Sequence, residues 1–272
     1  MIRTLTLALI VFLVSSAMAG RASSDQQDTL ATEETERFVQ GFVRFMAYHE
    51  AGHLLMQQLE GLHSDPDWTQ QDLEAYADQF AMVLMEPDPG DEDGMSEIIS
   101  ASLGWLQVNK AIAENDPHAP PHERAMDIIC LMYGSDTQGF SEFREYTRPE
   151  DDCAERYNSI EQQVETVFRN HSEAQGFEID IILDEPASDM IPAREFLDAT
   201  GLLYDLKDDI EADFFLTDRT TIRSTNCTGR AEPNQFYFDT HRGQTVDDDH
   251  YIITICYELI AKRLNYGTQG LD

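Results

Sequence analysis

Tyr48-His49-Glu50-Ala51-Gly52-His53-Leu54 is a His-Glu-x-x-His motif, set in an apolar-periodic run from Phe38 to Leu59. The periodicity predicts a long helix from about Glu33 to Glu60. Four residues make about one helical turn, so both imidazoles project from the same face. Two neutral imidazoles at this spacing can bind one Zn²⁺, and Glu50 then stands beside the metal, where it can act on a water. The alternative is a helix that carries two histidines by chance.

A second helix supplies acidic residues at helical spacing. Thr69-Gln70-Gln71-Asp72 has the pattern of a capping box, which predicts a helix to about Glu86. Within it Glu74 and Asp78 share one face, and Ala77 is small enough to allow another helix to approach closely. One carboxylate would complete a three-ligand zinc site with a fourth position left for water. The other would accept the second N–H group of a ligand histidine.

The first nineteen residues have the pattern of a secretory signal peptide. Arg3 provides the positive end, 7–14 the apolar core, and Ala17-Met18-Ala19 the small-residue cleavage pattern. We expect cleavage before Gly20, followed by a flexible polar segment over 20–32. The alternative, an uncleaved anchor, is disfavoured because the apolar stretch is short for a membrane span. The sequence therefore predicts an exported protein, periplasmic or secreted, without a membrane span after signal removal.

The charge and the cysteines of the chain exclude two further classes of function, nucleic-acid binding and metal binding by cysteines. The 272-residue chain has 52 acidic and 18 basic residues and a formal charge of -34. Such a field repels nucleic acid and anionic membranes, so we expect no nucleic-acid partner. Four cysteines in an exported chain favour disulfides, and no Cys-x-x-Cys pair indicates a cysteine metal site. The local pairing, Cys130 with Cys153 and Cys227 with Cys256, is one of three connectivities.

The order of elements predicts a mainly helical α+β protein. Helical patterns dominate the first 170 residues, whereas 177–183, 220–225, 235–239 and 250–256 have the character of strands. The last two strands are joined by a polar hairpin loop over 240–249. We expect one metallopeptidase-like domain over 33–272, with a helical part over 33–175 and an α/β part over 176–272. Two independent domains are the competing interpretation.

The two helices together resemble the arrangement of the gluzincin zinc peptidases, of which thermolysin is one. In that group a Glu-x-x-x-Asp segment follows the His-Glu-x-x-His helix at a comparable interval. The resemblance implies that Glu74 is the third zinc ligand and that Asp78 supports a ligand histidine. It also implies a zincin-like fold, in which a small sheet supports the active helix and one strand borders the cleft. Because only about a dozen residues separate the predicted signal peptide from the active helix, too few to form the sheet, we expect the sheet to come from residues 218–257, to be antiparallel and to pack on the active-site helices.

The chain also resembles a family of exported bacterial proteins that are assigned as metallopeptidases from their motif. The resemblance, with its place in an irregular loop, makes His118 the first candidate to stabilise the oxyanion that forms when a peptide bond is hydrolysed. The alternative is an ordinary loop histidine, and His122 and Tyr257 are the next candidates. The matching segments are Phe45 to His53, Ala77 to Ala81, His118 with Glu123-Arg124, Cys130 with Tyr133-Gly134, and Cys227 with Asn234, Phe236-Tyr237 and Ile253 to Leu259.

These observations predict a zinc-dependent peptidase that acts on peptides or proteins, with Glu50 as general base. The alternative is a non-catalytic exported protein that binds zinc or a partner on the same scaffold. Glu50 favours catalysis, because a structural zinc site has no need of that carboxylate. A closed site would require a fourth protein ligand, for which His63 or Asp72 are the candidates.

Overall fold

The computed structural model describes residues 24–58, 69–86, 92–106, 120–149, 151–171, 178–213, 216, 219–228, 236–241 and 250–269. The predicted signal peptide over 1–19, His63 and His118 lie outside these residues, as does the predicted hairpin loop except at its first two positions.

The motif lies on α2, a 35-residue helix over Ser24–Gln58. It begins nine residues before the expected start at Glu33, so much of the segment predicted to be flexible is helical. The added turns contain no proline or glycine that would stop a helix. The predicted start was wrong because these residues lack the apolar periodicity that was used to define the helix.

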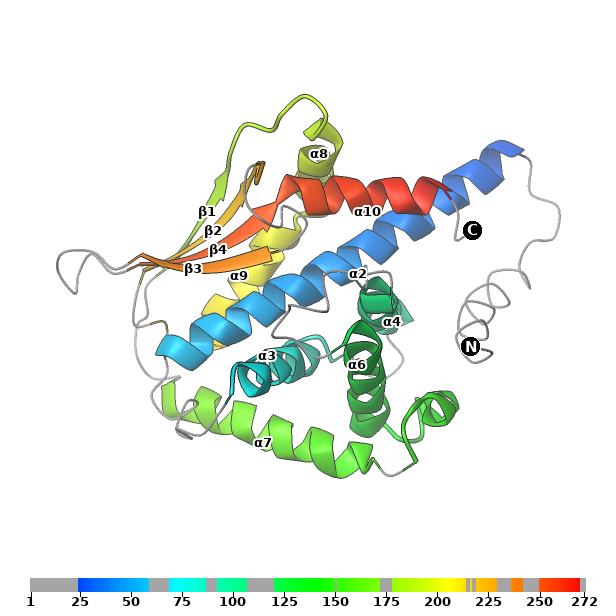
Figure 1. The fold of residues 1–272 in the computed structure, drawn as a ribbon, viewed down its shortest axis with the longest axis vertical. Coiled ribbons are helices and arrows are strands. Elements are labelled where there is room, and N and C mark those ends of the chain that lie inside the picture. The colour runs from blue at the N-terminus through cyan, green and yellow to red at the C-terminus, as the bar shows by residue number, and fades with distance from the viewer. Residues whose placement is uncertain are drawn as a thin grey trace.

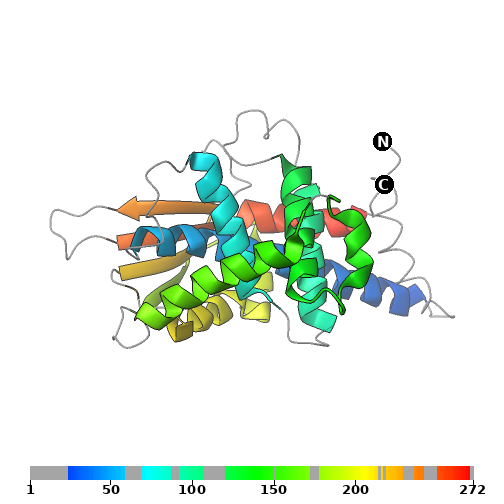
Figure 2. The ribbon, with the colours of Figure 1, turned by 90° about the horizontal axis from the view of Figure 1, so that it is seen from below.

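The helical part of the chain packs on one side of α2 (Figures 1 and 2). Its elements are α3 (Gln70–Leu84), α4 (Glu92–Leu106), α6 (Pro121–Ser135), the short 3₁₀ helix η1 (Ser141–Tyr146) and α7 (Cys153–His171). The predicted capping box of α3 is confirmed, since the Thr69 hydroxyl accepts from the Asp72 backbone N–H at 3.2 Å. The Asp72 carboxylate in turn accepts from the Thr69 backbone N–H at 2.8 Å.

Helices α2 and α3 approach each other at two small residues. A Cβ added to Gly52 would lie only 3.2 Å from Cα of Ala77. Both residues are buried, and the predicted role of Ala77 in a close helix contact is therefore confirmed. The contact lies one residue before His53 and one residue before Asp78, so it brings the two polar faces together.

The C-terminal part contains a four-stranded sheet in the order β1-β2-β4-β3. Its strands are β1 (Ile179–Leu183), β2 (Arg219–Thr225), β3 (Phe236–His241) and β4 (His250–Cys256). β3 and β4 are antiparallel, with Tyr237 opposite Thr254, so the predicted hairpin is confirmed. The other two pairs are parallel, with Ile222 between Ile181 and Ile253.

The expectation of a wholly antiparallel sheet was thus wrong. Between β1 and β2 the chain passes through α8 (Ile191–Thr200) and α9 (Leu202–Asp213), which are separated by Gly201 with a φ of 65°. Such a helical crossover allows the chain to enter the second strand in the same direction as the first. β3 lies between β2 and β4 in sequence and runs opposite to both strands. The chain therefore reverses direction before β3 and again after it, so that β4 runs parallel to β2.

The sheet packs onto the helical part through α2. In Figure 1, α2 crosses the molecule with the sheet, α8 and α10 (Tyr257–Gln269) on one side and α3, α4, α6 and α7 on the other, while α9 passes behind it. One buried apolar cluster contains residues of both parts, among them Phe42, Leu131 and Ile253. The protein is therefore a mainly helical α+β protein, as predicted.

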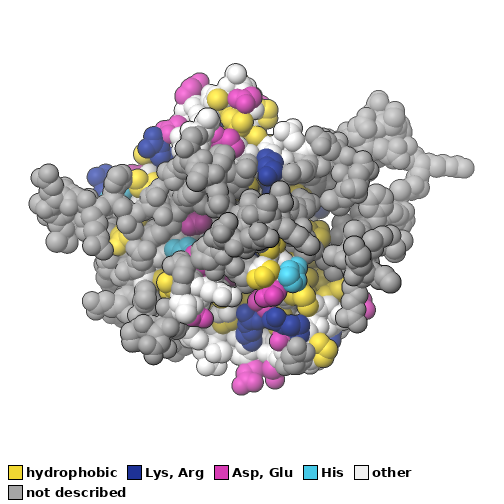
Figure 3. Space-filling model, viewed as in Figure 1, with side chains coloured by type: hydrophobic (Ala, Val, Ile, Leu, Met, Phe, Trp, Pro, Cys, Tyr) yellow, Lys and Arg dark blue, Asp and Glu magenta, His cyan; other side chains and the backbone are white. Residues whose placement is uncertain are grey.

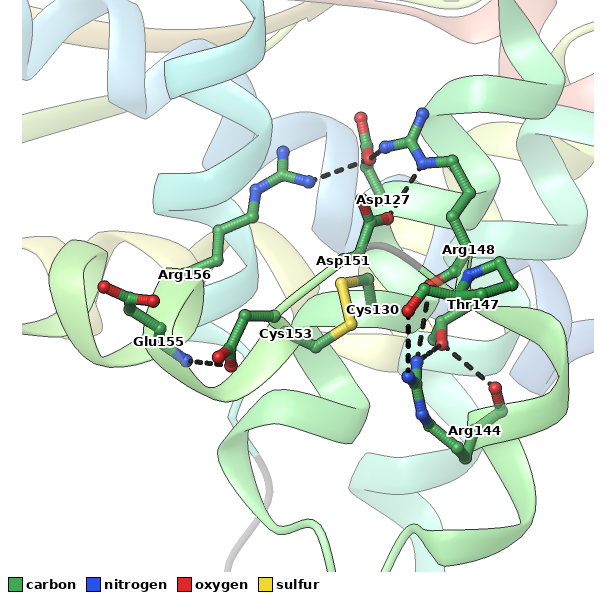
Figure 4. Close-up of a disulfide and its surroundings, with 11 residues drawn as sticks. Asp127, Cys130, Arg144, Thr147, Arg148, Asp151, Cys153, Glu155 and Arg156 are labelled. Carbon is green, nitrogen blue, oxygen red and sulfur yellow. Dashed lines mark hydrogen bonds and ion pairs between the residues drawn. A yellow bond between two sulfur atoms is a disulfide. The ribbon is translucent and has the colours of Figure 1, made fainter.

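Both predicted disulfides are present. Cys227 pairs with Cys256, and Cys130 on α6 pairs with Cys153, the first residue of α7. Figure 4 shows the surroundings of the second disulfide, where Asp127 accepts from Arg148 at 2.7 Å and from Arg156 at 2.8 Å. The disulfide and the ion pairs together fix α6 against α7.

Acidic side chains appear at several separate places on one face of the molecule, and a compact group of Lys and Arg side chains lies low on that face (Figure 3). The excess of acid is thus dispersed over the described part of this face. No helix among the described residues has the length and apolar character needed to cross a membrane.

Candidate metal centre

His49 and His53 lie one turn apart on α2 and turn their imidazoles toward each other. The two Nε2 atoms are 3.2 Å apart, and the rings are nearly perpendicular. His49 is buried, with 1% of its surface exposed, while His53 is partly buried. The spacing of four residues on one helix is enough to bring the two imidazoles together, as the motif predicts.

Glu74 of α3 meets both histidines across the contact between Gly52 and Ala77. Its Oε2 atom lies 3.2 Å from Nε2 of His49 and 3.0 Å from Nε2 of His53. The three ligand-type atoms therefore form a nearly equilateral triangle. Among the described residues, this is one of two groups of histidine, cysteine and acidic side chains with a geometry that suits a metal ion; the second consists of Glu258 and the disulfide cysteines 227 and 256.

The triangle fits a tetrahedral Zn²⁺. Nitrogen and carboxylate oxygen ligands lie about 2.0–2.2 Å from zinc, so tetrahedral ligand atoms are about 3.3–3.6 Å apart. The observed separations of 3.0–3.2 Å are only slightly shorter. Two imidazoles and one carboxylate are also the ligand types that leave a fourth zinc position open in catalytic sites.

Asp78 fixes the orientation of His49. Its Oδ1 atom lies 2.8 Å from Nδ1 of His49, so this nitrogen carries the proton when the ring is neutral. Nε2 is then left with a lone pair that faces Glu74 and His53. Burial would lower the pKa of His49, but the bonds to Asp78 and Glu74 outweigh it and raise this pKa to about 9. A metal ion must therefore displace a proton from His49 at neutral pH.

Arg124 of α6 holds Asp78 from the opposite direction. Its Nε donates to Oδ2 of Asp78 at 2.7 Å, and its Nη2 donates to Oδ1. Burial would raise the pKa of Asp78, but Arg124 and His49 hold it well below its usual range. Asp78 is therefore a carboxylate that accepts hydrogen bonds from both sides.

Glu50 is buried directly after His49 in α2, and 7% of its surface is exposed. Of the three candidates for oxyanion stabilisation, His118 lies outside the described residues. His122 is exposed near Glu123. Tyr257 is fully buried and donates from its hydroxyl to the backbone carbonyl of Asp184 at 2.8 Å, which indicates a packing role at the end of the sheet.

Sequence reasoning did not single out the contacts of Arg124 and Trp105. The guanidinium carbon of Arg124 lies 3.4 Å from the centre of the Trp105 ring, and both residues are buried. Neither the period of α4 nor that of α6 indicates such a pair, because the two residues are nineteen positions apart. The only available signal was the Glu-Arg pair that follows His118 in the family resemblance.

The fold and the His-His-Glu group together define an α+β protein with a candidate metal site between two helices. Over residues 6–168 the chain matches the family DUF4344, described as "Putative metallopeptidase". The match covers more than half of the 272 residues, and the chain belongs to this family. Membership implies a bound metal and peptide or protein substrates. Neither the curated proteins nor the solved structures contain a match.

Proposed function

We propose that this protein is a zinc-dependent peptidase in which His49, His53 and Glu74 hold the ion. The observation that carries this proposal is the triangle of ligand-type atoms with sides of 3.0–3.2 Å. The bond from His49 to Asp78 supports it, because it keeps the proton of the neutral ring on Nδ1, so that Nε2 is the nitrogen that can coordinate.

Glu50 is the general base of the proposed reaction. When bound, Zn²⁺ supplies a Lewis acid that acidifies a water and polarises the scissile carbonyl. Glu50 takes the proton from the attacking water and delivers it to the leaving amine nitrogen. By the family resemblance, His118 donates a hydrogen bond to the negative charge that develops on the carbonyl oxygen. Glu50 is the residue for which a purely structural zinc site has no use.

An extended peptide is the substrate form that the sheet favours. β3 is the last strand in the order of the sheet and packs beside α2, the helix of both histidines (Figure 1). Its edge away from β4 has no partner strand among the described residues. A peptide can pair with such an edge through its backbone and so be held in extended form. This argument agrees with the zincin resemblance, which implies a strand that borders the cleft.

The proposed peptidase is an exported protein. The two disulfides among the described residues suit an oxidising compartment such as the periplasm or the extracellular space. The N-terminal pattern of Arg3, an apolar core and Ala17-Met18-Ala19 would direct the chain there.

The decisive experiment compares wild type with Glu50→Gln. Zinc content is measured after purification, and cleavage is followed on casein and on a broad peptide library. We expect one equivalent of zinc in both proteins and cleavage only by the wild type, with a loss of at least about 100-fold in the variant. The substitution removes a proton acceptor but keeps the size of the side chain. Both proteins should therefore fold equally well, and a comparison of their folding excludes unfolding as the cause of lost cleavage.

Two other results would contradict the proposal in different ways. Zinc in both proteins without cleavage of any peptide would favour a non-catalytic zinc-binding or interaction protein. Absence of zinc from folded wild type, after dialysis against a slight excess of the ion, would exclude the metal site itself.

A further inference from the structure

Arg124 is a buried cation held along one edge and over one face. Only 3% of its surface is exposed. Two of its nitrogens bond the two oxygens of Asp78, an edge-on arrangement that fixes the guanidinium in the plane of the carboxylate. The indole of Trp105 covers its face, with 3.4 Å between the guanidinium carbon and the ring centre. This separation is well within the range of cation–π contacts.

The orientation of Arg124 is transmitted to His49 through one oxygen atom. Oδ1 of Asp78 accepts from Nη2 of Arg124 and also from Nδ1 of His49. A tilt of the guanidinium would turn this carboxylate and with it the imidazole. Nε2, the metal-facing atom, lies across the ring from Nδ1 and would move with it.

Trp105 is itself fixed against the motif helix. Its ring meets Phe42 of α2 edge to face, with 6.0 Å between the centres and an angle of 73°. Arg263 of α10 lies over the Phe42 ring at 4.3 Å. The indole is therefore held by the same helix that carries His49, seven residues further along.

We propose that Trp105 is a positioning residue of the metal centre, which acts on His49 through Arg124 and Asp78. The inference rests on the proposed function, since it assumes that His49 binds the ion. Trp105 is not one of the three candidate ligands. Its contribution is to keep the guanidinium from rotating away from Asp78, so that the metal-facing nitrogen of His49 stays in place.

The competing explanation is that Trp105 only fills the core, and a matched pair of variants separates the two. Trp105→Leu removes the flat face under Arg124, while Phe196→Leu removes an equally buried aromatic ring from α8, far along the chain from the site. Trp105 and Phe196 are 8% and 7% exposed. Both variants should lose stability, but only Trp105→Leu should lose zinc affinity.

Zinc affinity is measured by competition with a chromophoric chelator at fixed pH. We expect Trp105→Leu to raise the Kd by about tenfold, the lower end of the effect of groups that orient metal ligands. Trp105→Phe keeps an aromatic face and should stay within about threefold of wild type. The double variant Asp78→Asn/Trp105→Leu should bind no more weakly than Asp78→Asn alone, because both changes act through the same carboxylate.

A fluorescence measurement tests the inference without a change at position 105. The chain has two tryptophans, and Trp68→Phe leaves Trp105 as the sole source of tryptophan emission. Zinc titration of this protein should change the emission with an end point at one equivalent, and Arg124→Lys should remove most of that change.

Two results would overturn the inference: a Kd of folded Trp105→Leu within twofold of wild type, or an emission that zinc does not alter. The second decides the matter if Trp105→Leu does not fold. Both leave the proposed peptidase intact, because the wild type still binds zinc. If wild type binds no zinc, the proposed function fails and this inference fails with it.

Discussion

Asp78→Asn should damage the protein in two separable ways. The substitution preserves shape and removes one negative charge that is buried between Arg124 and His49. Arg124 then remains as a buried cation without its counter-ion, which typically costs about 3–5 kcal/mol of stability. The amide has a single acceptor oxygen for the donors of Arg124 and His49. If Arg124 takes it, the NH₂ group faces Nδ1 of His49 and shifts the ring proton to the metal-facing nitrogen.

The expected magnitudes follow from these contacts. For the metal-free protein, urea unfolding should show a loss of about 3–5 kcal/mol. Zinc affinity should fall by about 10- to 100-fold, or about 1.4–2.7 kcal/mol of binding free energy. Unfolding is measured in the presence of a chelator, and affinity is measured separately by competition, so that neither value contains the other.

Asp127→Asn is the matched control. Asp127 also accepts from two arginines, Arg148 and Arg156, but these ion pairs are partly exposed (Figure 4). Exposed pairs are each worth about 0–1 kcal/mol, so the control should lose much less stability and no zinc affinity. Adding Arg124→Met to Asp78→Asn should recover part of the lost stability, because no unpaired cation remains. Equal losses in the two single variants would refute the reasoning.

Three further predictions concern the proton, the helix contact and the disulfide. Since the pKa of His49 without metal is about 9, zinc affinity should rise by about tenfold per pH unit up to that value, and calorimetry in buffers of different ionisation enthalpy should detect about one proton released per ion at pH 7. Gly41→Ala should lower stability by about 1–3 kcal/mol in urea unfolding, because the new Cβ would lie 2.6 Å from the backbone of Glu97 on α4. Replacement of Cys130 and Cys153 by serine opens a loop of 23 residues and should cost about 3 kcal/mol by the same measurement.

The part of the metal centre that sequence could predict rests on local geometry. His49 and His53 are related by one helical turn, as are Glu74 and Asp78, and this spacing determines which side chains share a face. The pairing of the two helices was indicated by Ala77, because small residues allow backbones to approach. Sequence alone left Glu74 and Asp78 exchangeable, and the resemblance to gluzincins favoured Glu74. In the structure Glu74 lies between the two imidazoles and Asp78 lies behind His49.

The contacts that sequence could not predict join distant segments. Arg124 meets Asp78 across 46 residues, and the pattern of α6 gives an arginine in its first turn no reason to be buried. The directions of the strands in the sheet were equally hard to predict from sequence. Alternation and β-branched residues located the strands, and the short polar connection predicted the hairpin of β3 and β4. Strand direction elsewhere depends on the path of the intervening chain, which the strand sequences do not encode.

In the proposed function, the metal chemistry and the recognition of substrate lie in different parts of the chain. The helices that carry the candidate ligands, α2 and α3, and the supporting helices α4 and α6 all lie in the part of the chain that matches the family. The sheet follows this part, so that β3, the strand proposed to hold a peptide, lies outside it. The two parts meet on α2, which carries both histidines on one side and packs against the sheet on the other. Changes in the sheet can therefore alter which peptide is bound while the contacts among His49, Glu74, Asp78 and Arg124 remain as they are.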